Sequence, residues 1–227
     1  MSFSRFLKLS AAVAFAGVLA ASCGKSFAPG TAGSDKAGDA KPGASEQTAA
    51  LDGKPQSESE PTDPKKALEN LSQDLLDKLK MVPSEEEAAS IEEEIWDAWL
   101  VSGSPTVDIM MKRGLEYQEA EDVDSARHAY DTAIAIKPDY AEAWNRRALL
   151  FFNDGKYDEA VADLESALIY EPRHFGAWIG LGMIFESIER PEAALKAYRK
   201  ALEIHPHAAA ALQGEKRLVR AVEGMPI

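Results

Sequence analysis

Few side chains in this chain could do chemistry, and they are not gathered in one motif. The 227 residues include one Cys, Cys23, and four His, two of which flank a proline as His205-Pro206-His207. Two such His side chains could bind a metal ion, and a metal-dependent enzyme is the function class that this site would support. However, Pro206 also belongs to a regular spacing described below, a single Cys excludes a Cys-based zinc site, and the sequence has no Gly-rich phosphate loop. We therefore predict no catalytic site, no metal and no cofactor.

The charge of the chain narrows the choice of ligand. Lys and Arg number 25 against 38 Asp and Glu, which gives a formal net charge of −13. A protein that binds the phosphate backbone needs a basic face, so we expect no nucleic-acid partner. An acidic surface favours basic or neutral ligands.

The segment 1–22 has the pattern of a secretory signal peptide. Arg5 and Lys8 form a basic start, Leu9–Ala21 form an apolar run, and small residues follow. The run is short for a membrane-spanning helix, and a retained membrane anchor is the alternative interpretation. We expect residues 1–22 to direct export to the periplasm.

The single Cys lies where cleavage of that signal is expected. Leu19-Ala20-Ala21-Ser22-Cys23 resembles a bacterial lipobox, in which the Cys thiol is acylated and becomes the mature N-terminus. Ala20 and Ser22 also satisfy the small-x-small rule of ordinary signal peptidase, so both routes stay open. By resemblance to lipoprotein sorting rules, Gly24 after the Cys indicates the outer membrane. Removal of residues 1–22 takes away two basic residues, so any membrane attachment must come from lipid at Cys23.

Residues 23–64 have the composition of a disordered tether. Gly, Ala, Ser, Pro and charged residues dominate, and Phe27 and Leu51 are the only large apolar side chains after Cys23. Such a segment cannot bury enough apolar surface to offset its ordering entropy. As a flexible coil it would span about 35 Å.

Beyond the tether, prolines recur at a fixed interval. Pro138, Pro172 and Pro206 follow a 34-residue period, and three windows align without gaps over 107–140, 141–174 and 175–208. Within the windows, small residues, aromatic residues and alanines recur at matching positions: Gly114, Ala148 and Gly182, then Tyr117, Phe151 and Phe185, then Ala126, Ala160 and Ala194. These windows resemble tetratricopeptide repeats. Arg113 and Arg147 depart from the pattern, because the family usually has Leu there. We expect either more polar contacts at both positions or Arg side-chain stems that lie along the groove.

The resemblance implies an all-α fold in which paired helices stack into a right-handed superhelix, an α-solenoid of three repeats. We place this domain at residues 105–227, with a C-terminal capping helix in 209–227. Upstream, residues 65–104 contain two expected helices, 65–81 and 84–101. This pair is either a degenerate repeat or a dedicated N-terminal cap.

In this family, the first helix of each repeat lines a concave groove that binds peptides or partner helices. By resemblance, the residues that line it here, called the groove residues below, are Met111, Leu115, Gln118, Asn145, Leu149, Phe152, Asn153, Ile179, Met183 and Glu186. Some members hold a C-terminal carboxylate with Lys and Asn, but Arg146 occupies the usual Asn position and the Lys residues are missing. We therefore do not expect that clamp, although Arg146-Arg147 and Arg173-His174 are candidate anion contacts.

These observations predict a non-enzymatic adaptor on the periplasmic side of the envelope. It would bind a peptide or helix of another envelope protein in the groove, and only its lipid would touch the membrane. The alternative is an accessory structural subunit that docks through its convex face or through the N-terminal helix that carries Trp96 and Trp99. The sequence does not specify an oligomeric state.

Overall fold

The computed structural model describes residues 64–222 and Gly224. The expected signal peptide, Cys23 and nearly all of the tether lie outside the described residues. Within 64–222 the structure is all-α, as expected, with no strand. Its helices are α2 (Pro64–Met81), α3 (Glu85–Trp99), α4 (Pro105–Glu119), α5 (Val123–Ile136), α6 (Ala141–Asn153), α7 (Tyr157–Tyr170), α8 (Phe175–Ser187), α9 (Pro191–Ile204) and α10 (Ala209–Val222). None of these helices combines the length and the apolar character that crossing a membrane requires.

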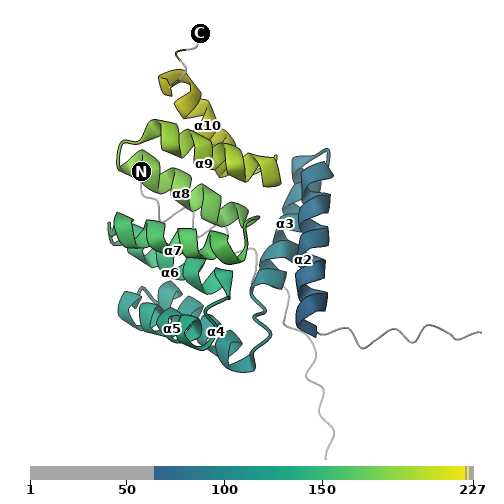
Figure 1. Ribbon diagram of the computed structural model, residues 1–227, viewed down its shortest axis with the longest axis vertical. Coiled ribbons are helices and arrows are strands. Elements are labelled where there is room, and N and C mark those ends of the chain that lie inside the picture. Colours follow the sequence, from purple (N-terminus) through teal and green to yellow (C-terminus); the bar gives the residue numbers. More distant parts are fainter. Residues whose placement is uncertain (1–63, 223, 225–227) are drawn as a thin grey trace, which may run out of the picture. The chain divides into compact units, whose positions relative to one another are not determined.

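Three helix pairs, α4–α5, α6–α7 and α8–α9, form a stack that α10 extends (Figure 1). Each pair coincides with one 34-residue window, so the predicted three-repeat solenoid is confirmed. Within the stack, the first helix of each later pair packs against the second helix of the pair before it. A single pair cannot bury its apolar face alone, and stacking buries that face between neighbours.

The turn inside each pair has the same backbone conformation in all three repeats. Glu121, Gly155 and Glu189 occupy the same position in successive repeats, and their φ angles are +61°, +73° and +57°. In each turn, the following amide donates to a carbonyl oxygen five residues earlier: Asp122 to Tyr117, Lys156 to Phe151 and Arg190 to Phe185. This is the bond that satisfies a helix C-terminus when a left-handed residue follows it. Gly adopts that conformation without strain, whereas it carries a steric cost for Glu121 and Glu189.

Small residues let the two helices of a pair approach closely around a tyrosine. A Cβ added at Gly114 would lie 2.3 Å from Cε1 of Tyr130, and one added at Gly182 would lie 2.6 Å from Cε1 of Tyr198. The middle repeat has Ala148 and Leu164 at the same two positions, and both are buried. A smaller side chain on the second helix therefore leaves room for a Cβ on the first.

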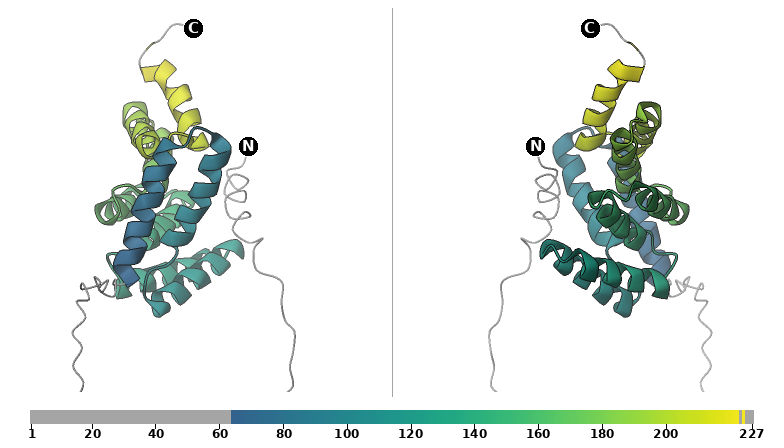
Figure 2. Two further views of the ribbon diagram at one scale, coloured as in Figure 1. Left: turned by 90° about the vertical axis from the view of Figure 1, so that its right-hand side faces the viewer. Right: turned by 90° about the vertical axis from the view of Figure 1, so that its left-hand side faces the viewer.

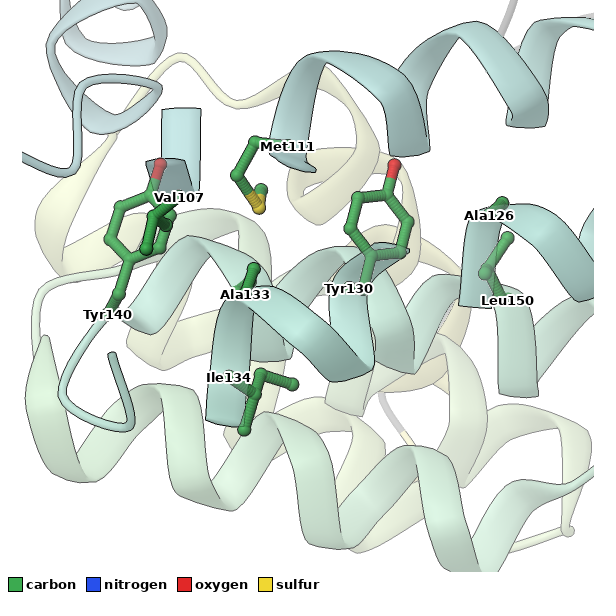
Figure 3. Packing of buried hydrophobic residues seen from close by; sticks show 9 residues of the cluster. Val107, Met111, Ala126, Tyr130, Ala133, Ile134, Tyr140 and Leu150 are labelled. Atoms are coloured by element: carbon green, nitrogen blue, oxygen red, sulfur yellow. The ribbon is translucent and has the colours of Figure 1, made fainter. Parts of the chain in front are cut away.

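The core of the first repeat shows this packing directly (Figure 3). Tyr130 points into the space between the helices with its ring fully buried. Around it lie residues from α4, α5 and α6 and the loop before α6, namely Val107, Met111, Ala126, Ala133, Ile134, Tyr140, Ala143 and Leu150. The core of one repeat thus includes residues of the next.

Arg147, one of the two departures from the family pattern, joins two repeats. Its guanidinium donates to Asp163 of its own repeat at 2.7 and 2.8 Å and to Asp131 of the preceding repeat at 2.7 Å. The same group lies over the ring of Trp144, 5.0 Å from the ring centre. The polar contact expected at Arg147 is therefore present, whereas Arg113 is exposed.

The outer face of α4 shows why the stack can begin there. In α6, α8 and α10, the two positions that face the preceding pair are buried: Ala143 and Leu150, Ala177 and Ile184, Ala211 and Leu218. The corresponding positions in α4 are Ile109, which is 52% exposed, and Glu116, which lies 3.9 Å from Lys112. This face of α4 is mostly charged, so it does not require another helix to cover it.

The N-terminal pair, α2–α3, lies outside the stack. It runs across the ends of the repeat helices, beside the turns that connect one pair to the next (Figures 1 and 2). Its buried side chains, among them Leu76, Leu79, Ile95 and Trp99, pack on Phe175 at the start of α8, with Ile179 and Ile204 beside them. We call this pair the N-terminal hairpin. Apart from Tyr140 at the end of the first repeat, its contacts are with the second and third repeats, so it is not placed as a further repeat ahead of α4.

Candidate functional site

The groove residues lie on α4, α6 and α8, and the hairpin divides them into two groups. The hairpin contacts the first half of α8, where Trp96 approaches Gly176 and Ile179 packs into the hairpin core. It also contacts the first half of α6, where the Arg146 guanidinium lies 5.8 Å from the centre of the Trp96 ring. The second halves of α4, α6 and α8 carry the other group. Leu115, Leu149, Phe152 and Met183 are half-buried there, and Asn153 is exposed.

Under the hairpin, four polar side chains form a cluster around two buried members, Glu142 and His174. Glu142 is 1% exposed and His174 is fully buried. Oε2 of Glu142 lies 3.0 Å from Nε2 of His174 and accepts a hydrogen bond from the Asn145 side chain, and Oε1 forms an ion pair with Nε of Arg146. Asn145, a predicted groove residue, is therefore held by Glu142.

The hydrogen bonds of this cluster fix its protonation. Nδ1 of His174 accepts from the N–H of Ala177 at 3.1 Å, so the ring proton sits on Nε2, which donates to Glu142. Burial would raise the pKa of the Glu142 carboxyl, but the charge of Arg146 and the hydrogen bond from His174 outweigh it and hold that pKa below its usual value. Glu142 is thus a buried, ionised group that orders the first turns of α6 and α8.

Aromatic stacking seats the hairpin on this cluster. The Trp99 ring stacks on His174 with centroids 4.1 Å apart, and Trp96 meets the edge of Phe175 at 5.3 Å. The Tyr140 hydroxyl donates to the carbonyl oxygen of Trp99 at 2.7 Å. Trp99 is only 8% exposed, so its side chain serves packing within the chain and is not available to dock a partner.

Polar contacts continue along the hairpin. Arg173 donates to Gln73 and Asp77 of α2, at 3.0 and 2.7 Å. Of the predicted anion contacts, Arg173, His174, Arg146 and Arg147 all therefore bind groups of this chain.

The two His of the possible metal pair also contact the hairpin, at different points. Nε2 of His205 lies 3.1 Å from Glu92, and Nε2 of His207 lies 3.1 Å from the carbonyl oxygen of Val82. Across the described part of the chain, no group of three or more His, Cys, Asp or Glu is arranged to hold a metal ion.

Three of the groove residues have structural roles that the sequence did not indicate. Met111 is 1% exposed, so the expectation that it lines an open groove is wrong: its side chain fills the core of the first repeat. Gln118 and Glu186 accept hydrogen bonds from the hydroxyls of Tyr130 and Tyr198, at 3.1 and 2.6 Å. Phe152 occupies the corresponding position in the middle repeat. That repeat has Leu164 where the other two have the tyrosine, so it has no hydroxyl to donate at this point.

The row of groove positions also extends beyond the groove residues, into α10. Gln213, Arg217 and Arg220 of α10 follow Ile179, Met183 and Glu186 by one repeat length. Arg217 binds Glu186 at 2.9 Å, and α10 packs against α8, so this helix continues the row of first helices. Extending the 34-residue spacing by one unit would have found these residues.

Comparison with known proteins decides the family of this stack. A model of the tetratricopeptide repeat family matches residues 111–164 and 146–209. These windows are tetratricopeptide repeats. The chain is 40% identical over 132 residues to a TPR repeat-containing protein of Rhizobium etli, covering 58% of this chain and 65% of the relative. It is 30% identical over 134 residues to small glutamine-rich tetratricopeptide repeat-containing protein 2 of Saccharomyces cerevisiae, covering 58% of this chain and 38% of that one. The chain thus spans less than two thirds of the length of these relatives.

Solved tetratricopeptide domains share the fold. The TPR domain of Arabidopsis OM64 has a TM-score of 0.50 and 24% identity, over 52% of this chain and 97% of that domain. The first TPR domain of Spaghetti (RPAP3), described as bound to an HSP90 peptide, has a TM-score of 0.51 and 21% identity, over 53% and 95%. At this identity the likeness concerns the fold alone.

Proposed function

We propose that this protein is a non-enzymatic adaptor that binds a peptide or helix of another protein on the open half of its tetratricopeptide groove. The observation that carries this proposal is the half-buried row of Leu115, Leu149, Phe152 and Met183 with exposed Asn153 beside it. The fold supports it, because a solved domain of the same fold is described as bound to a peptide.

The chemistry of this half-groove suits a short segment. Burial of one apolar side chain of a ligand contributes about 1.5–3 kcal/mol, and Leu149 and Phe152 offer apolar surface to it. Met183 adds an adaptable thioether. The Asn153 amide has both donors and acceptors, so it can bond to a peptide backbone in either direction.

The test is capture of partners after in-cell crosslinking, with mass spectrometry, for the wild type and for Leu149→Asp. The matched control is Ile169→Asp, which places the same charge on α7 at a side chain that is 74% exposed. We expect Leu149→Asp to lose a partner that the wild type and the control retain, while all three proteins unfold at similar temperatures. Equal capture by all three would contradict binding in the groove and favour a structural subunit that docks elsewhere.

The proposal places the adaptor on the periplasmic side of the envelope, tethered to the outer membrane by lipid on Cys23. The order of basic start, apolar run and Cys in residues 1–23 supports this location. Labelled palmitate tests it: the wild type should incorporate label and Cys23→Ser should not. Equal labelling of the two would exclude the lipid anchor.

A further inference from the structure

Four side chains of α10, three of them basic, indicate the chemistry of the ligand. Gln213, Lys216, Arg217 and Arg220 of α10 line an open hollow, and we call these residues the cationic end. Three of them belong to the same row as the groove residues, one repeat further along, and Lys216 stands beside Arg217. The residues that line the hollow therefore continue the row of groove positions by one more repeat length.

The charge of this end opposes that of the whole protein. Residues 191–222 contain six Lys and Arg against three Asp and Glu, in a chain whose net charge is −13. The carboxylates near the hollow are already engaged, since Glu186 binds Arg217 at 2.9 Å and Glu215 binds Arg199 at 2.9 Å. Lys216 and Arg220 are exposed, and neither forms an ion pair with a carboxylate anywhere in residues 64–222.

Arg217 gives the hollow a fixed wall. Its guanidinium donates to both carboxylate oxygens of Glu186, from Nε at 3.3 Å and from Nη2 at 2.9 Å. Glu186 in turn accepts from the Tyr198 hydroxyl, and the Tyr198 ring lies against Gly214 of α10. This chain of contacts holds α10 on α8, so the two unpaired cations are presented from an ordered helix.

We propose that the cationic end binds the carboxylates of an acidic segment in the partner protein, while the open half of the groove binds apolar side chains of the same segment. This inference rests on the proposed function. It reverses the expectation from composition, because the bulk negative charge predicts basic or neutral ligands, whereas the unpaired groups at this point are cations. Complementary charge at this end would set the direction in which the segment lies.

The experiment uses a peptide array whose members combine apolar and acidic residues, together with the same peptides carrying Gln or Lys in place of each acid. The proteins are the wild type, Lys216→Glu/Arg220→Glu, and the control Lys196→Glu, an exposed lysine of α9. We expect the wild type and the control to prefer acidic peptides. The double reversal should weaken that binding about tenfold, which is about 1.4 kcal/mol.

Four outcomes would overturn the inference. These are no binding to any acidic peptide, a preference for the Lys versions, an acid preference that survives the double reversal, and binding to phosphatidylglycerol vesicles in place of peptides that the double reversal abolishes. A parallel assay with Leu149→Asp separates the two proposals. If that variant binds the peptides normally, the groove proposal fails. If it loses them while the double reversal changes nothing, only the cationic end fails.

Discussion

At the scale of single residues, each repeat contains a pair of side chains, one on each helix, whose sizes complement each other. Gly on the first helix accompanies Tyr on the second in the first and third repeats, and Ala148 accompanies Leu164 in the middle one. The tyrosines also have acceptors twelve residues earlier, Gln118 and Glu186. The Gly–Tyr and Ala–Leu pairs therefore fill the same space in two different ways.

Gly114→Ala tests this pairing. The added Cβ would lie 2.3 Å from Tyr130, so we expect a loss of about 1–3 kcal/mol in the free energy of unfolding. Tyr130→Leu should relieve the clash, as Leu164 does beside Ala148. Chemical denaturation of both single variants and the double should give a coupling of about 1 kcal/mol or more. Additive losses would show that the two positions do not share one space.

The left-handed turn residues give a second test. Glu189→Gly should raise the free energy of unfolding by about 0.5–1 kcal/mol, because the φ of +57° costs a Glu side chain more than it costs Gly. The control Glu165→Gly, at an exposed position inside α7, should lower it by about 1 kcal/mol. A loss of stability in Glu189→Gly would mean that the Glu side chain stabilises the turn.

The buried Glu142 predicts a pH dependence. Its pKa is depressed below 4.5 in the folded protein, so its contribution to stability is complete above that pH and is lost as the pH falls through the folded-state pKa. Glu142→Gln should be less stable at pH 7 and lose less stability on acidification below pH 4.5. Thermal unfolding against pH measures this, with exposed Glu93→Gln as the control. Parallel curves for wild type and Glu142→Gln would contradict it.

At the scale of helices, the sequence predicted the elements well. The expected helices 65–81 and 84–101 correspond to Pro64–Met81 and Glu85–Trp99. Prolines and the apolar stripe of Ala88, Ile91, Ile95 and Trp99 mark these boundaries. The stripe indicates that one face is buried, but it carries no information on what buries it. The packing of the hairpin on His174 and Phe175 is a tertiary contact between residues more than seventy positions apart. The periodicity of apolar residues within one helix cannot reveal such a contact.

The 34-residue spacing predicted which candidate-site residues occupy equivalent positions in the repeats. It did not predict where a residue has a different contact in one repeat. The spacing aligned Leu149 with Leu115 and Met183, and Phe152 with Gln118 and Glu186. One further repeat length would have located Arg220. The spacing could not show that Met111 is covered or that Glu186 binds Arg217, because those depend on what the neighbouring helices contribute.

Trp99→Ala tests the seating of the hairpin. Removal of a stacked, buried indole should cost about 3–5 kcal/mol, and the loss should fall on the hairpin. Hydrogen exchange should become faster at amides of α2 and α3 while those of α6 and α7 stay protected. Glu94→Ala, exposed on α3, is the control and should leave exchange unchanged. Faster exchange throughout the repeats would show that the hairpin and the stack unfold as one unit.

At the scale of the whole molecule, the described chain is a stack of three helix pairs, with the N-terminal hairpin beside the ends of the repeat helices and α10 at the end of the stack (Figure 1). The hairpin uses residues that would otherwise be free to bind a ligand, including His174 and Ile179. The surface proposed to bind a ligand is therefore limited to the second halves of α4, α6 and α8 and to α10.

The most direct test of this account is site-specific photocrosslinking in cells. A photoreactive amino acid would replace Asn153 on the open half of the groove, and Ala162 or Glu165 on α7 for comparison; all three positions are exposed, so the folded protein tolerates them. The account predicts that one protein is captured from Asn153 and not from α7. Capture of that same protein from α7 and not from Asn153 would contradict binding in the groove.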